Sequence, residues 1–182
     1  MRPDEFAAIF DTFKVSAFRL EALPVYSVEE FAEEFEAWRA GEPLPEYTVD
    51  TSPWLARIDR DTHAGKFWQR VHIVDLPIND YLRWELSYYR AQAAAGEDIR
   101  IAARADNPQL GDLTCDYWLF DVGAPRPFAV QMVYDDAGRP GAHHLITDPA
   151  QIAAYHHGQV TAWSVAQPLA EFLAAQPVSL TA

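Results

Sequence analysis

The stretch Asp116-Tyr117-Trp118-Leu119-Phe120-Asp121 carries large side chains at every central position. Side chains alternate along a strand, so residues 116, 118 and 120 share one face and residues 117, 119 and 121 share the other. A strand with bulky groups on both faces is normally covered on both sides. We therefore expect residues 116–121 to form an interior strand, next to a strand over residues 99–103.

The segments before this strand predict a βαβ unit. Residues 67–76 alternate in polarity as a strand does, and Pro77 and Asn79 then open a helix that ends at Gly96. Residues 99–103 form the next strand. A long helix between two strands predicts that the strands are parallel and that the crossover is right-handed.

The segments after it predict a hairpin followed by helices. Residues 128–134 and 142–146 read as antiparallel strands joined by a turn over residues 135–139. Asp148-Pro149 is a helix start, and helical sequence continues to Ala175 with interruptions at Gly158 and Pro168.

The N-terminal part predicts a helix over residues 6–13, a strand over 15–21 and a second helix that ends at Gly41. The spacing of Ser27 to Glu30 resembles a capping box. The apolar side chains that this second helix should bury are Val28, Phe31, Phe35 and Trp38. Residues 42–66 are rich in proline and are expected to form a long loop, a common setting for a binding lid.

Together these segments predict an α/β (α+β) fold. It contains a single mixed sheet of about five strands, with a βαβ unit, a C-terminal β-hairpin and flanking helices. Since 182 residues is close to the size of one domain, we expect a single globular domain over residues 1–182. Its parts are a helix-strand-helix segment (1–41), the long loop (42–66), the sheet core (67–147) and C-terminal helices (148–176).

Charge and composition restrict the partners. The chain has 14 Lys and Arg against 27 Asp and Glu, a formal net charge of −13. A chain of this charge is repelled by nucleic-acid phosphates and by anionic membrane surfaces, so we expect neither as a direct partner. The sequence has no apolar run of transmembrane length, no signal-peptide pattern and a single cysteine, Cys115. We expect a cytoplasmic protein.

Charged residues inside apolar strands are the first candidates for a site. Arg70 and His72 share one face of their strand and require carboxylate partners, for which Asp116, Asp121 and Glu97 are the candidates. Such a pair is either a buried ion pair or a clamp for an anionic ligand. The two aspartates either cap backbone amides at the strand ends or lie at a pocket edge.

Aromatic residues near these charges complete a predicted pocket for a small ligand. The residues expected to line it or to supply its polar contacts are Trp68, Arg70, His72, Tyr81, Trp84, Glu97, Asp116, Trp118 and Asp121.

We expect no metal and no cofactor. Neighbours in a strand face opposite ways and neighbours in a helix lie about 100° apart, so neither His143-His144 nor His156-His157 chelates one ion. Cys115 precedes an apolar strand and is expected to be a core residue. The sequence contains no HExxH, GxGxxG, Walker or GxSxG motif.

Several segments resemble an actinobacterial family of domains of unknown function that carries a DFWLFD-type strand. They are residues 16–21, 70–77, 81–85, 96–99, 116–121 and 134–138. Association of that family with small helix-turn-helix regulators implies a regulatory or ligand-sensing accessory role.

The order of strands and helices is also similar to half of a phospholipase D-like domain. That activity requires a His-x-Lys motif, and no histidine here is followed two positions later by lysine. The similarity therefore implies binding rather than catalysis.

Three functions follow as hypotheses. The first is a non-catalytic, small-ligand-sensing accessory protein that works with a transcriptional regulator. The second is a small-molecule enzyme that uses His72, or Asp116 or Asp121, as general acid or base. The third is a protein-interaction module that uses the acidic helix expected over residues 27–40.

Overall fold

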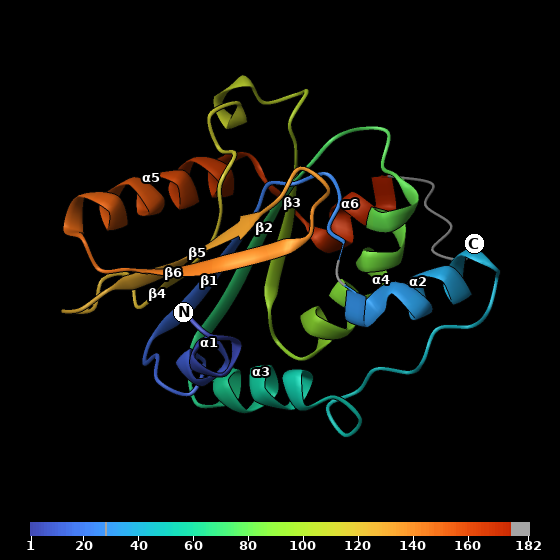
Figure 1. The fold of residues 1–182 in the computed structure, drawn as a ribbon, viewed down its shortest axis with the longest axis horizontal. Helices are drawn as coiled ribbons and strands as arrows, with labels where there is room; N and C mark the ends of the chain where they lie inside the picture. Colours follow the sequence, from blue (N-terminus) through green and yellow to red (C-terminus); the bar gives the residue numbers. More distant parts are fainter. Residues whose placement is uncertain (28, 176–182) are drawn as a thin grey trace.

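The computed structural model describes residues 1–27 and 29–175 and centres on a mixed sheet (Figure 1). Its seven strands run in the order β6-β5-β4-β1-β2-β3-β7. They are β1 (Ser16–Glu21), β2 (Phe67–Val74), β3 (Asp98–Ala103), β4 (Asp116–Phe120), β5 (Phe128–Tyr134), β6 (Pro140–Ile146) and β7 (Gln167–Pro168). The α/β class is confirmed, but the expected number of about five strands is too low. One of the additional strands, β7, has only two residues, too few for an alternating pattern.

Helices cover both faces of this sheet. They are α1 (Pro3–Ile9), η1 (Glu29–Phe31), α2 (Ala32–Arg39), α3 (Pro53–His63), α4 (Asp80–Ala94), η2 (Pro108–Leu110), α5 (Pro149–Val165) and α6 (Leu169–Ala175). Helix α5 packs on the face that carries Phe18, Val71 and Leu119. Helices α1 and α3 lie across the sheet from α5, and α4 and α6 cover β2 and β3 on that same side (Figure 1).

The βαβ unit is confirmed. Strands β2 and β3 are parallel, with Arg70 opposite Ile99 and His72 opposite Ile101. Helix α4 connects them and begins at Asn79, whose side chain accepts a hydrogen bond from the Leu82 amide at 2.8 Å. The expected hairpin of β5 and β6 is also present.

The expected position of residues 116–121 in the sheet is confirmed in part. All five residues of β4 are buried, so it is an interior strand as predicted. However, β4 pairs antiparallel with β1 and β5, and β1 and β2 separate it from β3. The reason is that β1 occupies the sheet centre, where Ala17 and Phe18 are buried on opposite faces.

The expectation of a loop throughout residues 42–66 is wrong, because its second half forms α3. Ser52 caps this helix by accepting from the Leu55 amide, and Pro53 occupies its first turn. Leu55 and Ile58 are three residues apart and both are buried. Apolar residues at helical spacing therefore form a helix here, although the proline-rich composition predicts a loop.

Two details of the expected helices also differ. Gly158 does not interrupt α5; a side chain there would approach the Tyr117 hydroxyl to 2.9 Å, so glycine permits close packing of helix and sheet.

Near α2, Trp38 is buried as predicted but Phe31 is exposed, because residues 29–31 form a 3₁₀ turn before the helix. Val28 and residue 176, the end of the expected C-terminal segment, lie outside the described residues.

Within residues 1–27 and 29–175, no helix combines the length and apolar character needed to cross a bilayer.

Candidate functional site

A chain of ion pairs crosses the sheet face that α4 covers. Asp116 Oδ2 accepts from Arg19 Nη2 at 2.7 Å, and Arg19 Nε lies 3.4 Å from Glu21 Oε1. Glu21 Oε2 accepts from Arg70 Nη1 at 2.8 Å, and Arg70 Nε donates to Glu97 Oε1 at 2.9 Å. Each of these side chains is at most 9% exposed. We call these five residues the ionic chain.

Strand register explains why acids and bases alternate in the ionic chain. Arg19 lies opposite Arg70 across β1 and β2, and Glu21 lies opposite His72 two residues further on. Side chains two residues apart share a face, so Glu21 reaches diagonally to Arg70. Glu97 ends the chain because Gly96, with φ +110°, turns the backbone between α4 and β3.

Tyrosines and a histidine extend the network. Tyr26 donates to Asp116 at 2.7 Å, and Tyr89 donates to Glu21 at 2.5 Å. His72 Nδ1 lies 2.9 Å from the Tyr89 hydroxyl. Burial lowers the pKa of His72 despite the nearby Glu21 charge, so the imidazole is neutral at neutral pH.

The protein shifts the pKa values of these carboxyl groups in opposite directions. Burial would raise the pKa of Glu21, but the guanidinium groups of Arg70 and Arg19 outweigh it and hold that pKa below its ordinary value. Glu85, on α4, has a pKa well above its ordinary value because it is buried and faces the charge of Glu21. Burial also raises the pKa of Glu97, more than Arg70 lowers it. Glu21 therefore keeps its negative charge to lower pH than an ordinary glutamate, whereas the protein favours the protonated, neutral form of Glu85.

A pocket of about 180 Å³ opens beside the ionic chain, between α4 and the strands. This volume corresponds to roughly six water molecules. The pocket, called the ionic pocket below, is lined by Glu21, Tyr26, Phe31, Arg70, Tyr81, Trp84, Glu85, Tyr88, Tyr89, Gln92 and Tyr134.

Two acceptor atoms of residues that line the ionic pocket are buried without a hydrogen-bond partner among the described residues. They are Glu85 Oε2 and Gln92 Oε1. His72 Nδ1 lies 3.5 Å from Glu85 Oε2, but it is closer to the Tyr89 hydroxyl. Buried acceptors are normally paired in folded proteins, so these two atoms are available to a ligand donor.

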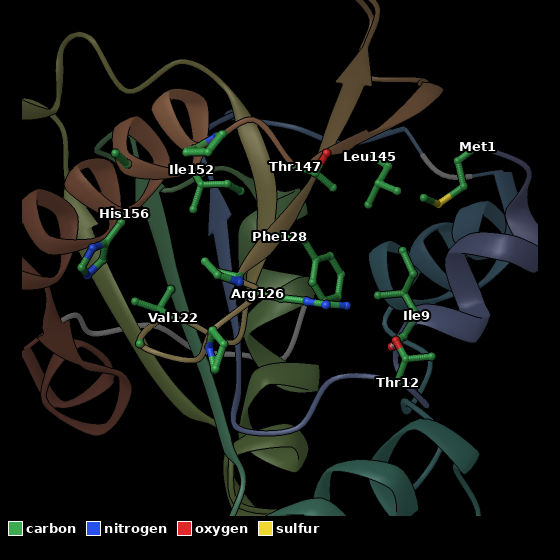
Figure 2. A pocket seen from close by; sticks show the side chains of 15 residues that line it. Met1, Ile9, Thr12, Val122, Arg126, Phe128, Leu145, Thr147, Ile152 and His156 are labelled. Atoms are coloured by element: carbon green, nitrogen blue, oxygen red, sulfur yellow. Dashed lines mark hydrogen bonds between the residues drawn. The ribbon is translucent and has the colours of Figure 1, made fainter.

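A second, larger cavity lies elsewhere on the molecule. It has a volume of about 1050 Å³ and is bounded by α1, the loop after β4, the end of β6 and the start of α5. Figure 2 shows the Arg126 side chain extending across it toward α1, with Ile9, Phe128 and Leu145 among the apolar groups around it. None of the nine sequence-predicted binding residues lines this cavity.

The structure does not bring those nine residues into one pocket. Arg70, Tyr81 and Trp84 line the ionic pocket. His72, Glu97 and Asp116 lie in the surrounding network without lining it. Trp68, Trp118 and Asp121 lie further along the same strands, outside the ionic pocket.

Trp68 and Trp118 belong to a packed group of rings. Their centroids are 5.9 Å apart in an edge-to-face arrangement, and Phe10 packs against both. We call this group the aromatic cluster. Its members are Phe10, Phe13, Trp54, Trp68, Trp118 and Phe120.

Asp121 and Asp116 have different roles at the two ends of β4. The Asp121 carboxylate accepts from the backbone amides of Lys14 and Val15 at 2.9 and 2.7 Å. This confirms the interpretation of Asp121 as a backbone cap. Asp116 also caps a backbone amide, that of Ala22 at 2.9 Å, and its other oxygen is paired with Arg19.

The prediction that Arg70 is buried and bonded to a carboxylate is confirmed, with Glu97 as one partner. Sequence reasoning missed Glu21 and Glu85. Glu21 had a usable signal, because it follows Arg19 at the same-face spacing of a strand. Glu85 stands in an aromatic helix, and only the packing of α4 on the sheet brings it to Glu21.

One group of side chains of the metal-ligating types lies close enough together to hold an ion. Glu21, His72 and Glu85 each offer an atom within 4.8 Å of the others. The Tyr89 hydroxyl is already bonded to Glu21 and His72, so a metal ion would have to displace it. No such group in the described part of the chain contains His143, His144, His156 or His157.

A comparison with known protein families identifies a match over most of the chain. A profile described as a domain of unknown function (DUF6879) matches residues 4–174. The expected resemblance to a family of unknown function is thereby confirmed. Its actinobacterial origin, its strand motif, its association with regulators and the phospholipase D-like similarity stay predictions. No curated protein matches the sequence.

Proposed function

The chain belongs to the DUF6879 family of domains of unknown function, and we propose that it is a small-ligand-sensing accessory protein whose ligand binds in the ionic pocket. One observation carries the proposal. The pocket combines aromatic walls with a buried carboxylate oxygen, Glu85 Oε2, that has no hydrogen-bond partner among the described residues. Mostly apolar walls with a few convergent polar groups are typical of small-molecule sites.

The surroundings of the expected acid-base residues favour binding over catalysis. Asp116 is bonded to Arg19, and Asp121 is bonded to backbone amides. His72 is buried against Tyr89 and does not line the pocket. A general acid or base must reach its substrate, and these groups face their own protein partners.

A small-molecule enzyme is the second candidate, and one observation favours it. Glu85 lines the pocket and has a raised pKa, because burial and the Glu21 charge favour its protonated form. Such carboxyl groups are frequent among catalytic acids. Turnover by the wild type that is lost in folded Glu85→Gln would favour this candidate over sensing.

Helix α2 supports a route from the pocket to a partner protein. Glu34 on α2 accepts hydrogen bonds from Trp84 Nε1 and from the hydroxyls of Tyr88 and Tyr47. Glu34 is therefore partly buried against these rings, whereas Glu33 and Glu36 on the same helix are exposed. A ligand that moves Trp84 or Tyr88 would move α2 with them.

The exposed side of α2 is the surface that we propose docks a regulator. Glu33 and Glu36 are exposed there and carry negative charge. In this proposal the partner is a helix-turn-helix transcriptional regulator, which is recognised through basic side chains. The third hypothesis, an acidic interaction helix, thereby becomes the output of the sensor.

The test of ligand binding is a thermal-shift screen of small polar compounds in cationic, neutral and anionic forms. We expect at least one compound to raise the Tm and to shift NMR amide signals over residues 81–92. If no compound raises the Tm, the proposal is wrong. Signal changes confined to α1, residues 122–128 and α5 would assign the ligand to the larger cavity instead.

The test of the partner is sedimentation velocity of the chain mixed with a helix-turn-helix regulator from the same organism. We expect a complex whose amount changes with the stabilising compound and which Glu33→Lys weakens. Glu171→Lys, at an exposed position on α6, is the matched control. A complex that is equally sensitive to both charge reversals would contradict docking on α2.

A further inference from the structure

We propose that the ionic pocket selects a small organic cation, a primary ammonium or guanidinium compound, which donates to Glu85 and Gln92 and packs against the rings of α4. This inference rests on the proposed function, because it names the ligand class of the same pocket. It is carried by three features of the described residues: a charge imbalance, unpaired acceptors and an aromatic wall.

The charge imbalance comes from the side chains around the pocket. The carboxyl groups of Glu21, Glu85, Glu97 and Asp116 outnumber the guanidinium groups of Arg19 and Arg70 by two. An excess of buried negative charge is costly unless protons or a bound cation neutralise it. In the free protein a proton on Glu85 supplies part of this neutralisation, and a cation beside Glu85 would replace that proton.

The unpaired buried atoms of the residues that line the pocket are both acceptors, whereas the unpaired donor Arg19 Nη1 belongs to a residue that does not line it, so the ligand has to be a donor. Glu85 Oε2 has no partner among the described residues, and once the carboxyl group gives up its proton to solvent it offers only acceptor sites. Gln92 Oε1 is the second such atom among the lining residues. An ammonium or guanidinium group carries several N–H donors and fits this requirement.

An anionic ligand fits the pocket less well, although Arg70 lines it. The Arg70 guanidinium is already bonded to Glu21 and to Glu97. An incoming carboxylate would also meet the charge of Glu21. The anion clamp considered from the sequence is therefore not favoured.

The aromatic wall comes from one stripe of α4. Tyr81, Trp84 and Tyr88 lie on one side of the helix, with ring centroids 5.5 Å apart for the first pair and 5.1 Å for the second. All three line the pocket. Aromatic faces attract cations, most strongly where water is excluded. The wall therefore favours an organic cation over a hydrated metal ion.

The direct test compares butylammonium, 1-butanol and butyrate, which share a hydrocarbon body and differ in charge. Each is titrated into the full chain, with calorimetry and Tm as readouts. We expect butylammonium to bind and raise the Tm, and the other two compounds to have at most one tenth of its affinity. Methylguanidinium should behave like butylammonium.

Two variants locate the effect. Glu85→Gln preserves the shape of the side chain but cannot ionise when a cation binds, and it should weaken butylammonium binding at least about tenfold while circular dichroism stays unchanged. Glu171→Gln changes an exposed acid on α6 and should bind like the wild type. If both variants bind butylammonium equally well, Glu85 is not the recognition group and the inference is wrong.

The failure of the inference and that of the proposed function are distinguishable. If 1-butanol or butyrate binds the pocket as tightly as butylammonium, the cation class is wrong but the pocket is still a ligand site. Stoichiometric binding of Zn²⁺ that Glu85→Gln abolishes would also replace the organic cation. If neither these probes nor the wider compound screen stabilises the chain, both proposals fail.

Discussion

Trp118 and Asp116 lie two residues apart on the same face of β4, yet they enter opposite environments. Trp118 packs in the aromatic cluster, against Phe10 and Trp68. Asp116 ends the ionic chain, bonded to Arg19 and Tyr26. One continuous sheet face thus has an aromatic half under α1 and α3 and an ionic half under α4.

The difference lies in how each half depends on its neighbours. Ring packing is largely non-directional, so the loss of one ring removes area and leaves a cavity. Ion pairs are directional, so the loss of one partner leaves the others charged and unpaired. The effect of a substitution in the aromatic half should therefore be proportional to the buried apolar area that it removes. In the ionic half the effect should depend on which partner is removed.

The largest effect is expected for Trp118→Ala in the aromatic half. Trp118 is 5% exposed, so truncation should reduce the free energy of unfolding by about 3–5 kcal/mol. Urea denaturation measures it. Trp54→Ala, at a partly buried ring of the same cluster, should cost less. A Trp118→Ala protein as stable as the wild type would show that this half does not depend on the rings.

Arg70→Met should destabilise the ionic half by about 3 kcal/mol, because it leaves Glu21 and Glu97 without their shared cation. Combining Arg70→Met with Glu21→Gln and Glu97→Gln should recover part of that loss. Urea denaturation of the single and triple variants measures both. If the triple variant is less stable than the single one, the loss does not come from stranded charge.

The next largest effects are expected for Asp116 and Asp121, at the two ends of β4, and the two substitutions should differ in their stability loss. Asp116→Asn weakens a bond to a buried guanidinium and should cost about 2 kcal/mol. Asp121→Asn keeps one oxygen for the amides of Lys14 and Val15 and should cost about 1 kcal/mol. Thermal melts of both variants test the order. Equal losses would contradict an additional contribution from the pair of Asp116 with Arg19.

The smallest effect is expected for Glu85→Gln, and it should depend on pH. The folded-state pKa of Glu85 is raised by burial and by Glu21, so the folded chain holds a proton that the unfolded chain releases above about pH 4.5. This contribution makes the wild type less stable as pH rises from there toward the folded pKa. Glu85→Gln should match the wild type near pH 4 and exceed its stability at higher pH.

The Glu21 carboxyl group should behave in the opposite way. Its folded-state pKa is lowered, because Arg70 and Arg19 outweigh burial, so its contribution is present above about pH 4.5 and is lost as pH falls. Denaturant titrations of wild type, Glu85→Gln and Glu21→Gln separate the two groups if they extend from about pH 2 to about pH 8, because the Glu21 contribution changes only below about pH 4.5. Parallel pH profiles for all three proteins would contradict the assignment of charge to Glu21 and of the proton to Glu85.

The sequence by itself determined the local elements and much of the burial. Period-two alternation identified residues 116–121 as an interior strand, and helix signals at Asn79 and Gly96 identified the βαβ unit. The burial of Arg70 also followed, because a charged residue inside an apolar strand has to be paired. These are properties of neighbours in the chain, so the sequence carries them directly.

Only the tertiary structure decided which elements meet. The sequence did not reveal that β1 separates the aromatic strand from β3, because strand order depends on long-range pairing. It also grouped Trp68 and Trp118 with Arg70 in one pocket, whereas only Arg70 lines the ionic pocket and the Trp118 ring packs beside the Arg70 guanidinium, 5.9 Å from it. Glu85 joins Glu21 only through the packing of α4 on the sheet. A buried charge has to find a partner, but its own strand does not specify which distant side chain that partner is.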